Sequence, residues 1–209
     1  PVQPINPSVE VTVPVSGNEN TVHVEASVSG TTATVDTVDM SHLHEVIGDH
    51  VETGTVSIDF SHLNSSHSEE ATGTEIAHID TVKIPAETIK KIAEAVADPE
   101  NDAESLEIVL SDGASIEFDA AALAEKVSQA NGADITISIK QATVVDEVLT
   151  SAQKQTVGSR VAFDISVTSG GTHISDMGGK IIIHAPYELA EGETAEGIVV
   201  YYVDDAGNR

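Results

Sequence analysis

The 209-residue chain contains no cysteine and no tryptophan, and it has only three phenylalanines and three tyrosines. Without cysteine, disulfide bonds, thiolate catalysis and zinc sites built on thiolates are all excluded. Sugar-binding modules usually stack sugar rings on aromatic side chains. The scarcity of aromatic residues therefore disfavours a carbohydrate-binding module, although it does not exclude one.

Basic residues are also few, with nine lysines and arginines against 35 acids and a net charge of −26. A field of this sign repels nucleic-acid phosphates and anionic lipid headgroups, so neither nucleic acid nor a membrane surface is expected as a partner. No run of 18 or more apolar residues occurs, and membrane insertion is not predicted. Residues 1–8, which are rich in proline, are typical of an extended linker.

The clearest hydrophobic periodicity lies between Ile79 and Ile139. Residues 79–84 alternate apolar and polar side chains, which predicts a strand with one buried face. Pro85 is suited to a first helical position, because its missing N–H would be unpaired there. The apolar residues that follow recur at helical spacing and predict one buried stripe: Ile89, Ile92, Ala93 and Val96.

The second half of this region repeats strand and helix signals. Strands are predicted at 106–110 and 115–118, joined by a hairpin turn at 111–113. Asp119 is suited to cap a helix over 120–130 in which Leu123 and Val127 face inward. Asn131 and Gly132 end this helix, and residues 135–139 form the last strand. The order β-α-β-β-α-β predicts an α+β core with its helices on one face of a small sheet.

The N-terminal part reads as a meander of strands at 9–15, 21–28 and 32–38. Ser41 is the expected cap of a short helix that ends at Gly48. Three apolar residues at helical spacing give this helix its buried face: Leu43, Val46 and Ile47. A further strand is predicted at 55–60.

Two short stretches of the N-terminal part recur later. Residues 35–38 resemble 79–82, and residues 57–60 resemble 115–118. We interpret residues 9–142 as one α+β domain with a degenerate internal duplication, in which a strand near Leu106 is inserted into the second half. Chance similarity between short β-rich stretches is the alternative.

Residues 143–158 are predicted to be a connector or a short helix, and residues 159–209 to be a β-rich, sandwich-like subdomain without helices. Strands are expected at 160–168, 180–186 and 197–203. Residues 204–208 have hairpin-turn chemistry but no strand after them, so the subdomain is predicted to be truncated at its C-terminus.

The chain resembles a module of large secreted or surface-attached proteins of Gram-positive gut bacteria, often found upstream of S-layer homology repeats. The resemblance rests on VKIPAETIKKIAEAV, SLEIVLSDGASIEFDAAALAEKV, VGSRVAFDISVTSGGTHISDMGGKIIIHAPYEL and GIVVYYVDDAGN, and it covers roughly residues 9–209. It implies an extracellular, wall-proximal and non-catalytic role, and it implies no ligand-binding residues.

Histidine is unusually frequent, and His42, His44 and His50 form the densest group. They are the candidate ligands for zinc. Histidines two apart on a helix project about 200° from each other, so His42 and His44 can share an ion only if their segment is extended or turn-like. Solvated surface histidines are the simpler interpretation, and we assign no metal site.

The acidic stretch 98–104 places a carboxylate at nearly every second position, which suggests calcium. It lacks the glycine that an EF-hand turn requires, and a helix-terminating loop explains it equally well. No G-x-S-x-G motif and no convincing pair of catalytic acids occurs, so the chain is not expected to be an enzyme. We predict no cofactor, with calcium or zinc as alternatives.

The sequence thus predicts a structural or interaction module, a spacer or adhesion element, of a larger protein at the cell surface or cell wall. Its expected partners are neighbouring domains of that protein and a host or cell-wall glycan or protein. The alternative is a ligand-binding or carbohydrate-binding adhesin module, metal-assisted through the histidine-rich half.

Overall fold

The computed structural model describes residues 9–13, 20–49, 54–61, 78–142, 149–158, 160–174, 176–204 and 206–209. Within these residues the helices are α1 (Met40–Asp49), α2 (Ala86–Val96), α3 (Ala120–Ala130), α4 (Ser151–Val157) and the short η1 (Ala195–Gly197). The strands are β1 (Val9–Val13), β2 (Val24–Ser29), β3 (Thr32–Val38), β4 (Thr55–Asp59), β5 (Thr81–Ile84), β6 (Ser105–Val109), β7 (Ser115–Asp119), β8 (Ile135–Ala142), β9 (Ala162–Ser169), β10 (Thr172–His173) and β11 (Ile181–His184).

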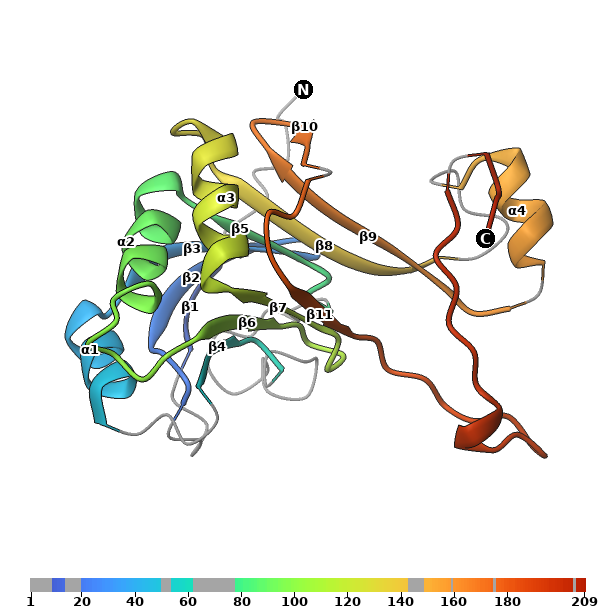
Figure 1. Cartoon of the computed structure of the whole chain (residues 1–209), viewed down its shortest axis with the longest axis horizontal. Coiled ribbons are helices and arrows are strands. Elements are labelled where there is room, and N and C mark those ends of the chain that lie inside the picture. Colours follow the sequence, from blue (N-terminus) through green and yellow to red (C-terminus); the bar gives the residue numbers. More distant parts are fainter. Residues whose placement is uncertain are drawn as a thin grey trace, which may run out of the picture.

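The strands form two sheets, each with parallel and antiparallel neighbours. One has seven strands in the order β1-β2-β3-β5-β8-β9-β10, and the other has four in the order β11-β7-β6-β4. Helices α1, α2 and α3 lie together along one side of the two sheets (Figure 1). The predicted α+β class is confirmed.

Local signals explain where the central helices begin and end. Pro85 precedes α2, whose buried residues include the whole predicted stripe from Ile89 to Val96. The Asp119 side chain accepts a hydrogen bond from the backbone N–H of Ala122 and caps α3. Asn131 ends α3 in the left-handed conformation, with φ 47°. At α1 the cap is Asp39 rather than the predicted Ser41, because the Asp39 carboxylate accepts the N–H groups of Ser41 and His42.

The strands of the central region do not share one small sheet, which corrects the prediction. β5 pairs with β8 in the seven-stranded sheet, whereas β6 pairs with β7 in the four-stranded sheet. Helices α1, α2 and α3 therefore each carry the chain from one sheet to the other. Three such bridging units lie side by side: β3-α1-β4, β5-α2-β6 and β7-α3-β8.

The first two bridging units place their strands in the same way. β3 runs parallel to β5, and β4 runs parallel to β6, with Ile58 opposite Ile108. The counterpart of β4 is therefore β6, whereas the sequence comparison had matched β4 with β7. β7 runs antiparallel to β6 and belongs to the third unit, which crosses in the opposite direction.

The C-terminal strands join the sheets already described instead of forming a sheet of their own. β9 pairs with β8 along its whole length, from Ala142 opposite Ala162 to Ile135 opposite Ser169. β11 pairs with β7 and forms an edge of the four-stranded sheet. The predicted boundary near Gly158 therefore does not separate two sheets. Within 143–158, residues 151–157 form helix α4, and 143–148 lie outside the described residues.

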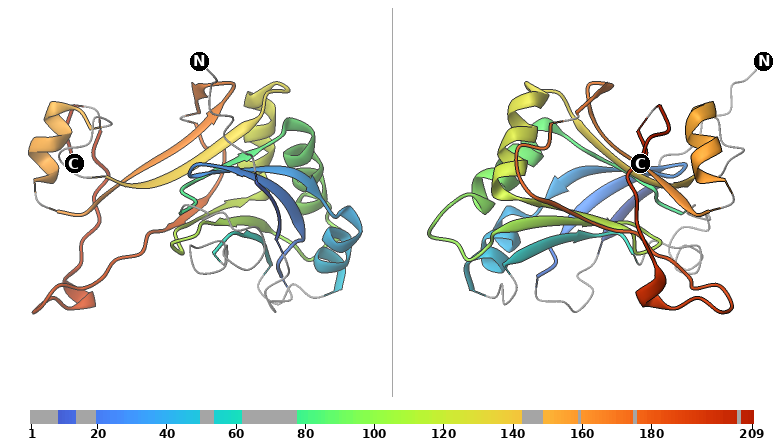
Figure 2. Two further views of the ribbon diagram at one scale, coloured as in Figure 1. Left: turned by 180° about the vertical axis from the view of Figure 1, so that it is seen from behind. Right: turned by 45° about the vertical axis from the view of Figure 1, so that its right-hand side comes forward.

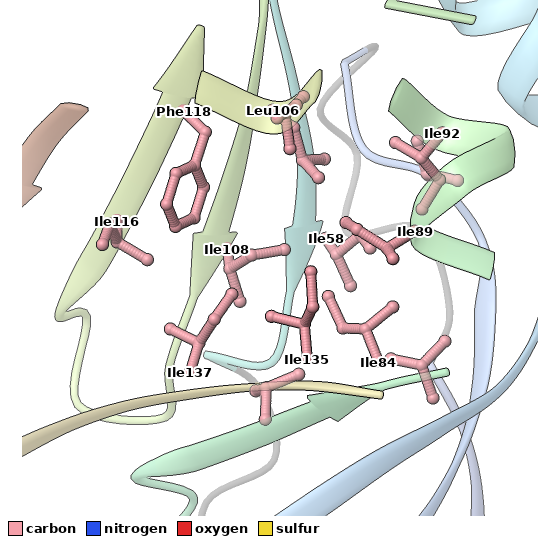
Figure 3. Close-up of a cluster of buried hydrophobic side chains, with 14 of the residues drawn as sticks. Ile58, Ile84, Ile89, Ile92, Leu106, Ile108, Ile116, Phe118, Ile135 and Ile137 are labelled. Carbon is pink, nitrogen blue, oxygen red and sulfur yellow. The ribbon is translucent and has the colours of Figure 1, made fainter. Parts of the chain in front are cut away.

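A single hydrophobic core fills the space between the sheets and the three helices. Figure 3 shows Ile58 and Ile108 of the four-stranded sheet pointing toward Ile84 and Ile137 of the seven-stranded sheet, with Ile89 of α2 beside them. All five are buried. Since apolar burial supplies most of the driving force for folding, this cluster holds the two sheets together.

An exposed ion pair supports the start of α2. Lys83 Nζ of β5 lies 2.9 Å from Asp134 Oδ2 just before β8, and Asp134 also accepts a hydrogen bond from the backbone N–H of Ala86. The hydrogen bond from Lys83 lowers the pKa of Asp134 below its ordinary value, and the N–H of Ala86 acts in the same direction.

Shortening a side chain in the core is expected to destabilise the protein strongly. Ile108→Ala leaves a cavity between the sheets and should lower the free energy of unfolding by about 2–5 kcal/mol. Val200→Ala, at a side chain that is 89% exposed, should change it by less than about 0.5 kcal/mol. Urea denaturation followed by circular dichroism measures both. Equal losses would show that the two sheets are not held by this core.

Acid should weaken the folded state through Asp134. A carboxyl whose pKa is lowered by folding stabilises the folded state above its unfolded pKa, and that stability is lost as pH falls through the folded pKa. Asp134→Asn should therefore destabilise the protein at neutral pH and should flatten the fall in stability on acidification. Thermal denaturation of both proteins over a pH series tests this. An identical pH profile for the two would contradict it.

Candidate functional site

The histidines singled out in the sequence do not converge. His42 and His44 lie on α1, where His42 is half-buried and His44 is exposed. The ring of His42 stacks on that of His23, with ring centroids 4.2 Å apart and an interplanar angle of 18°. His50 lies outside the described residues.

This stacked pair is poorly arranged for metal binding. The nitrogen lone pairs of an imidazole lie in the plane of its ring, so two nearly parallel rings direct them into separate planes. The Nδ1 atom of His42 is buried and has no hydrogen-bond partner among the described residues. Nor does the described part of the chain contain a group of three or more histidines and carboxylates placed to hold an ion.

The acidic loop after α2 uses its polar groups on its own backbone. The Asp98 carboxylate accepts the N–H of Glu100, and the Asn101 side chain donates to the carbonyl of Ala95 at the end of α2. An open depression of about 440 Å³ lies beside the loop and is lined in part by Asp98 and Glu104. This is the arrangement of a helix-terminating loop.

The outer face of the four-stranded sheet is polar. Glu107 of β6 lies directly opposite Glu117 of β7. The hydroxyl of Ser115 donates to Glu107, and that of Ser105 donates to Glu117. These bonds offset part of the repulsion expected between like charges on adjacent strands. Two carboxylates supplied with hydroxyl donors make a surface suited to polar ligands, and His184 of β11 lies opposite Ser115 in the same register.

The most unusual surface belongs to the C-terminal limb, which we define as residues 185–209. It leaves the end of β11, runs away from both sheets and returns to α4 (Figures 1 and 2). The limb contains η1 and, in the described residues, no strand. Most of its residues are exposed.

The first part of the limb is held by a pair of hydrogen bonds to the Glu193 carboxylate, which we call the Glu193 cluster. Its carboxylate accepts bonds from the Tyr187 hydroxyl, at 2.7 Å, and from the backbone N–H of Ala190. The bond from Tyr187 lowers the pKa of Glu193 below its ordinary value, and the same bond raises the pKa of the Tyr187 hydroxyl.

The end of the limb is a closed turn that docks on α4. The Asp204 carboxylate accepts bonds from the backbone and side-chain N–H groups of Asn208, which lower the pKa of Asp204. The hydroxyl of Thr156 on α4 donates to the carbonyl of Gly207 at 2.7 Å. Gly207 has φ 82°, and a Cβ there would lie 2.7 Å from the carbonyl oxygen of Ala152. Among the described residues of the predicted turn, Asp204 therefore bonds to Gly207 and Asn208, and the turn needs glycine at its contact with the helix.

The apolar segment, which we define as residues 198–203, lies between the Glu193 cluster and the turn that begins at Asp204. Val200 is 89% exposed, Tyr202 is 84% exposed and Val199 is 65% exposed. Residues 197–203 were predicted to be a strand, and this is corrected: among the described residues the segment forms no β-pair, although its sequence favours a strand. Within the described chain, residues 199–203 make no backbone hydrogen bond.

Comparison with known proteins adds no relative. No family model, curated protein or solved structure matches this chain. The helices of the described residues include none with the length and apolar character needed to cross a membrane. The site must therefore be judged on its own geometry.

The exposed apolar segment is the feature that sequence reasoning missed. Alternation and β-branched residues correctly indicated an extended backbone but could not reveal whether a neighbouring strand was available.

Docking of the turn on α4 should depend on Gly207. Gly207→Ala places a methyl group against the carbonyl of Ala152 and should release the turn, changing the NMR amide shifts of Ala152 and Thr156. Gly192→Ala is the matched control, because Gly192 also has a positive φ, of 89°, but a Cβ there would meet nothing within 4 Å. If neither variant moves the α4 resonances, the turn is not docked in solution.

Proposed function

We propose that the chain is a non-catalytic interaction module of a larger extracellular protein at the cell surface, and that the apolar segment is its contact element. One observation carries this proposal. Residues 199–202, all apolar or aromatic, are exposed on a limb that projects from an otherwise closed core.

Physical chemistry supports a binding role for such a segment. Contiguous exposed apolar surface is uncommon on soluble proteins and commonly marks an interaction site. Burying one valine side chain contributes roughly 1.5–3 kcal/mol. Tyrosine is also frequent at the residues that contribute most to protein interfaces, and Tyr201 and Tyr202 stand next to each other here.

The remainder of the described surface supports a scaffold rather than a catalyst. The carboxylates and hydroxyls that we located bond to one another or to the backbone, as at Glu107, Glu117 and Asp98. The extracellular and wall-proximal location rests on the sequence resemblance to modules of Gram-positive surface proteins.

A second candidate, a glycan-binding adhesin module, is favoured by the polar outer face of the four-stranded sheet. The opposed carboxylates of Glu107 and Glu117 could accept hydrogen bonds from sugar hydroxyls. The registered positions of this face hold no phenylalanine, tyrosine or tryptophan, and so the first proposal is preferred.

The contact role predicts that polar substitution in the segment removes binding without unfolding the protein. The test compares the natural chain with the triple variant Val199→Ser, Val200→Ser and Tyr202→Ser on a panel of immobilised extracellular-matrix proteins and peptidoglycan. The natural chain should bind at least one component. The variant should bind it at least about tenfold more weakly, which corresponds to roughly 1.4 kcal/mol. Surface plasmon resonance gives both affinities.

The control is Glu107→Gln with Glu117→Gln, which alters the polar face and leaves the apolar segment intact. Unchanged thermal melting should show that both variants are folded. Loss of binding only in the Glu107 and Glu117 variant, together with saturable binding on a glycan array, would favour the adhesin and overturn the contact role. Binding abolished by a chelator would point to the metal-assisted form of that adhesin.

A further inference from the structure

We infer that the apolar segment binds by strand addition, and that its partner is an edge β-strand with an apolar centre and lysine or arginine at both ends. This inference rests on the proposed function and names the partner class for the same site. Backbone hydrogen bonding, side-chain exposure and charge support it in turn.

Within the described chain, the backbone of the segment has no hydrogen-bond partner between Ile198 and Asp204. Ile198 donates its N–H to the carbonyl of Ala195, and the next backbone hydrogen bond along the chain is that of Asp204, whose N–H donates to the carbonyl of Asn208. The residues between them present their N–H and C=O groups in a row. Strand addition to such a row supplies affinity through main-chain hydrogen bonds.

The two sides of the segment differ. In an extended chain alternate residues face opposite ways, which places Val200 and Tyr202 on one side and Val199, Tyr201 and Val203 on the other. Val200 and Tyr202 are 89% and 84% exposed, whereas Val199 is 65% exposed, Val203 is half-buried and the guanidinium of Arg209 lies 5.2 Å from the ring centroid of Tyr201. The side with Val200 and Tyr202 is therefore the more available to the side chains of a partner strand.

Charge selects the kind of strand. The segment itself is uncharged, whereas Glu191, Glu193 and Glu196 precede it and Asp204 and Asp205 follow it. A second copy of this chain would bring the same acids to both ends and would also carry a net charge of −26. A strand with basic ends instead meets opposite charge at both ends, so electrostatic complementarity favours it over self-association.

Two synthetic peptides test the partner class: KVTVTVK as the probe, and EVTVTVE as its matched control of opposite charge. Binding is followed by tyrosine fluorescence in the Tyr187→Phe background. In this background the two remaining tyrosines, Tyr201 and Tyr202, both lie in the segment. KVTVTVK should bind saturably and about five- to tenfold more tightly than EVTVTVE at about 20 mM salt, and the difference should shrink at about 0.5 M salt.

A proline in the segment should abolish binding, because proline cannot donate a ladder hydrogen bond. Val200→Pro should therefore no longer bind KVTVTVK. Val200→Thr keeps the backbone N–H and favours a strand, so its affinity for the peptide should stay within about twofold of that of the natural chain. The 89% exposure of Val200 makes unfolding of either variant unexpected, and circular dichroism checks this.

Several outcomes overturn the inference. Equal affinity for the two peptides removes the charge argument, and unaltered binding by Val200→Pro removes strand addition. Self-association in analytical ultracentrifugation that Val200→Pro abolishes, without peptide binding, assigns the segment to a second copy. If KVTVTVK does not bind, but the triple serine substitution still weakens binding to a component of the protein panel, the partner class is wrong and the proposed function stands. If the peptide does not bind and the triple serine substitution has no effect on panel binding, the proposed function is also wrong.

Discussion

The two sheets exclude water by packing their inner faces together, with Ile58 and Ile108 on one side and Ile84 and Ile137 on the other. This burial determines the remaining architecture. A four-stranded and a seven-stranded sheet leave an open side between them, and the apolar stripes of α1, α2 and α3 close it. The helices can serve this purpose because each connects a strand of one sheet to a strand of the other. Connection and cover are therefore provided by the same residues.

The outer surface follows different rules. Acids predominate there, and many are engaged locally, as when Asp119 caps α3 and also accepts the N–H of Lys180 ahead of β11. Lys126 of α3 differs from these surface acids because it is a basic residue and is only 1% exposed. Its ammonium group donates to the carbonyl of Asp176. Burial lowers the pKa of Lys126, while the nearby acids Asp176 and Glu125 act in the opposite direction. The bond from Lys126 therefore attaches residues 176–180, which lead into β11, to α3. The nearby acids help to keep this lysine charged.

The sequence was sufficient where the deciding interactions are local. Pro85, Asp119 and Asn131 mark helix ends through the conformation of their own residues or of residues within one turn. The boundaries at Asp119 and Asn131 are confirmed, and Pro85 lies at the N-cap, one residue before the first helical position predicted for it. The division into two sheets could not be read in this way, because alternation shows which face of a strand is buried but not which strand lies beside it. For the same reason β4 was matched to β7 instead of β6. At the candidate site, the extended backbone of 198–203 was predictable, but its lack of a partner strand was not. The stacking of His42 on His23 joins α1 to a residue before β2, and no spacing rule predicts it.

The crossing of each bridging unit between the sheets affects how the molecule gains and loses its structure. The chain visits the four-stranded sheet between β3 and β5, although these two strands are neighbours in the seven-stranded sheet. Neither layer is a continuous stretch of chain, so neither can detach as an intact piece. Ser105 of β6 bonds to Thr55 of β4, which lies 50 residues earlier in the chain, and closing a loop of this length costs conformational entropy. Packing against the opposite sheet offsets that entropy loss. Assembly should consequently be slow and all-or-none, and partial unfolding should begin in the limb and leave the layers intact.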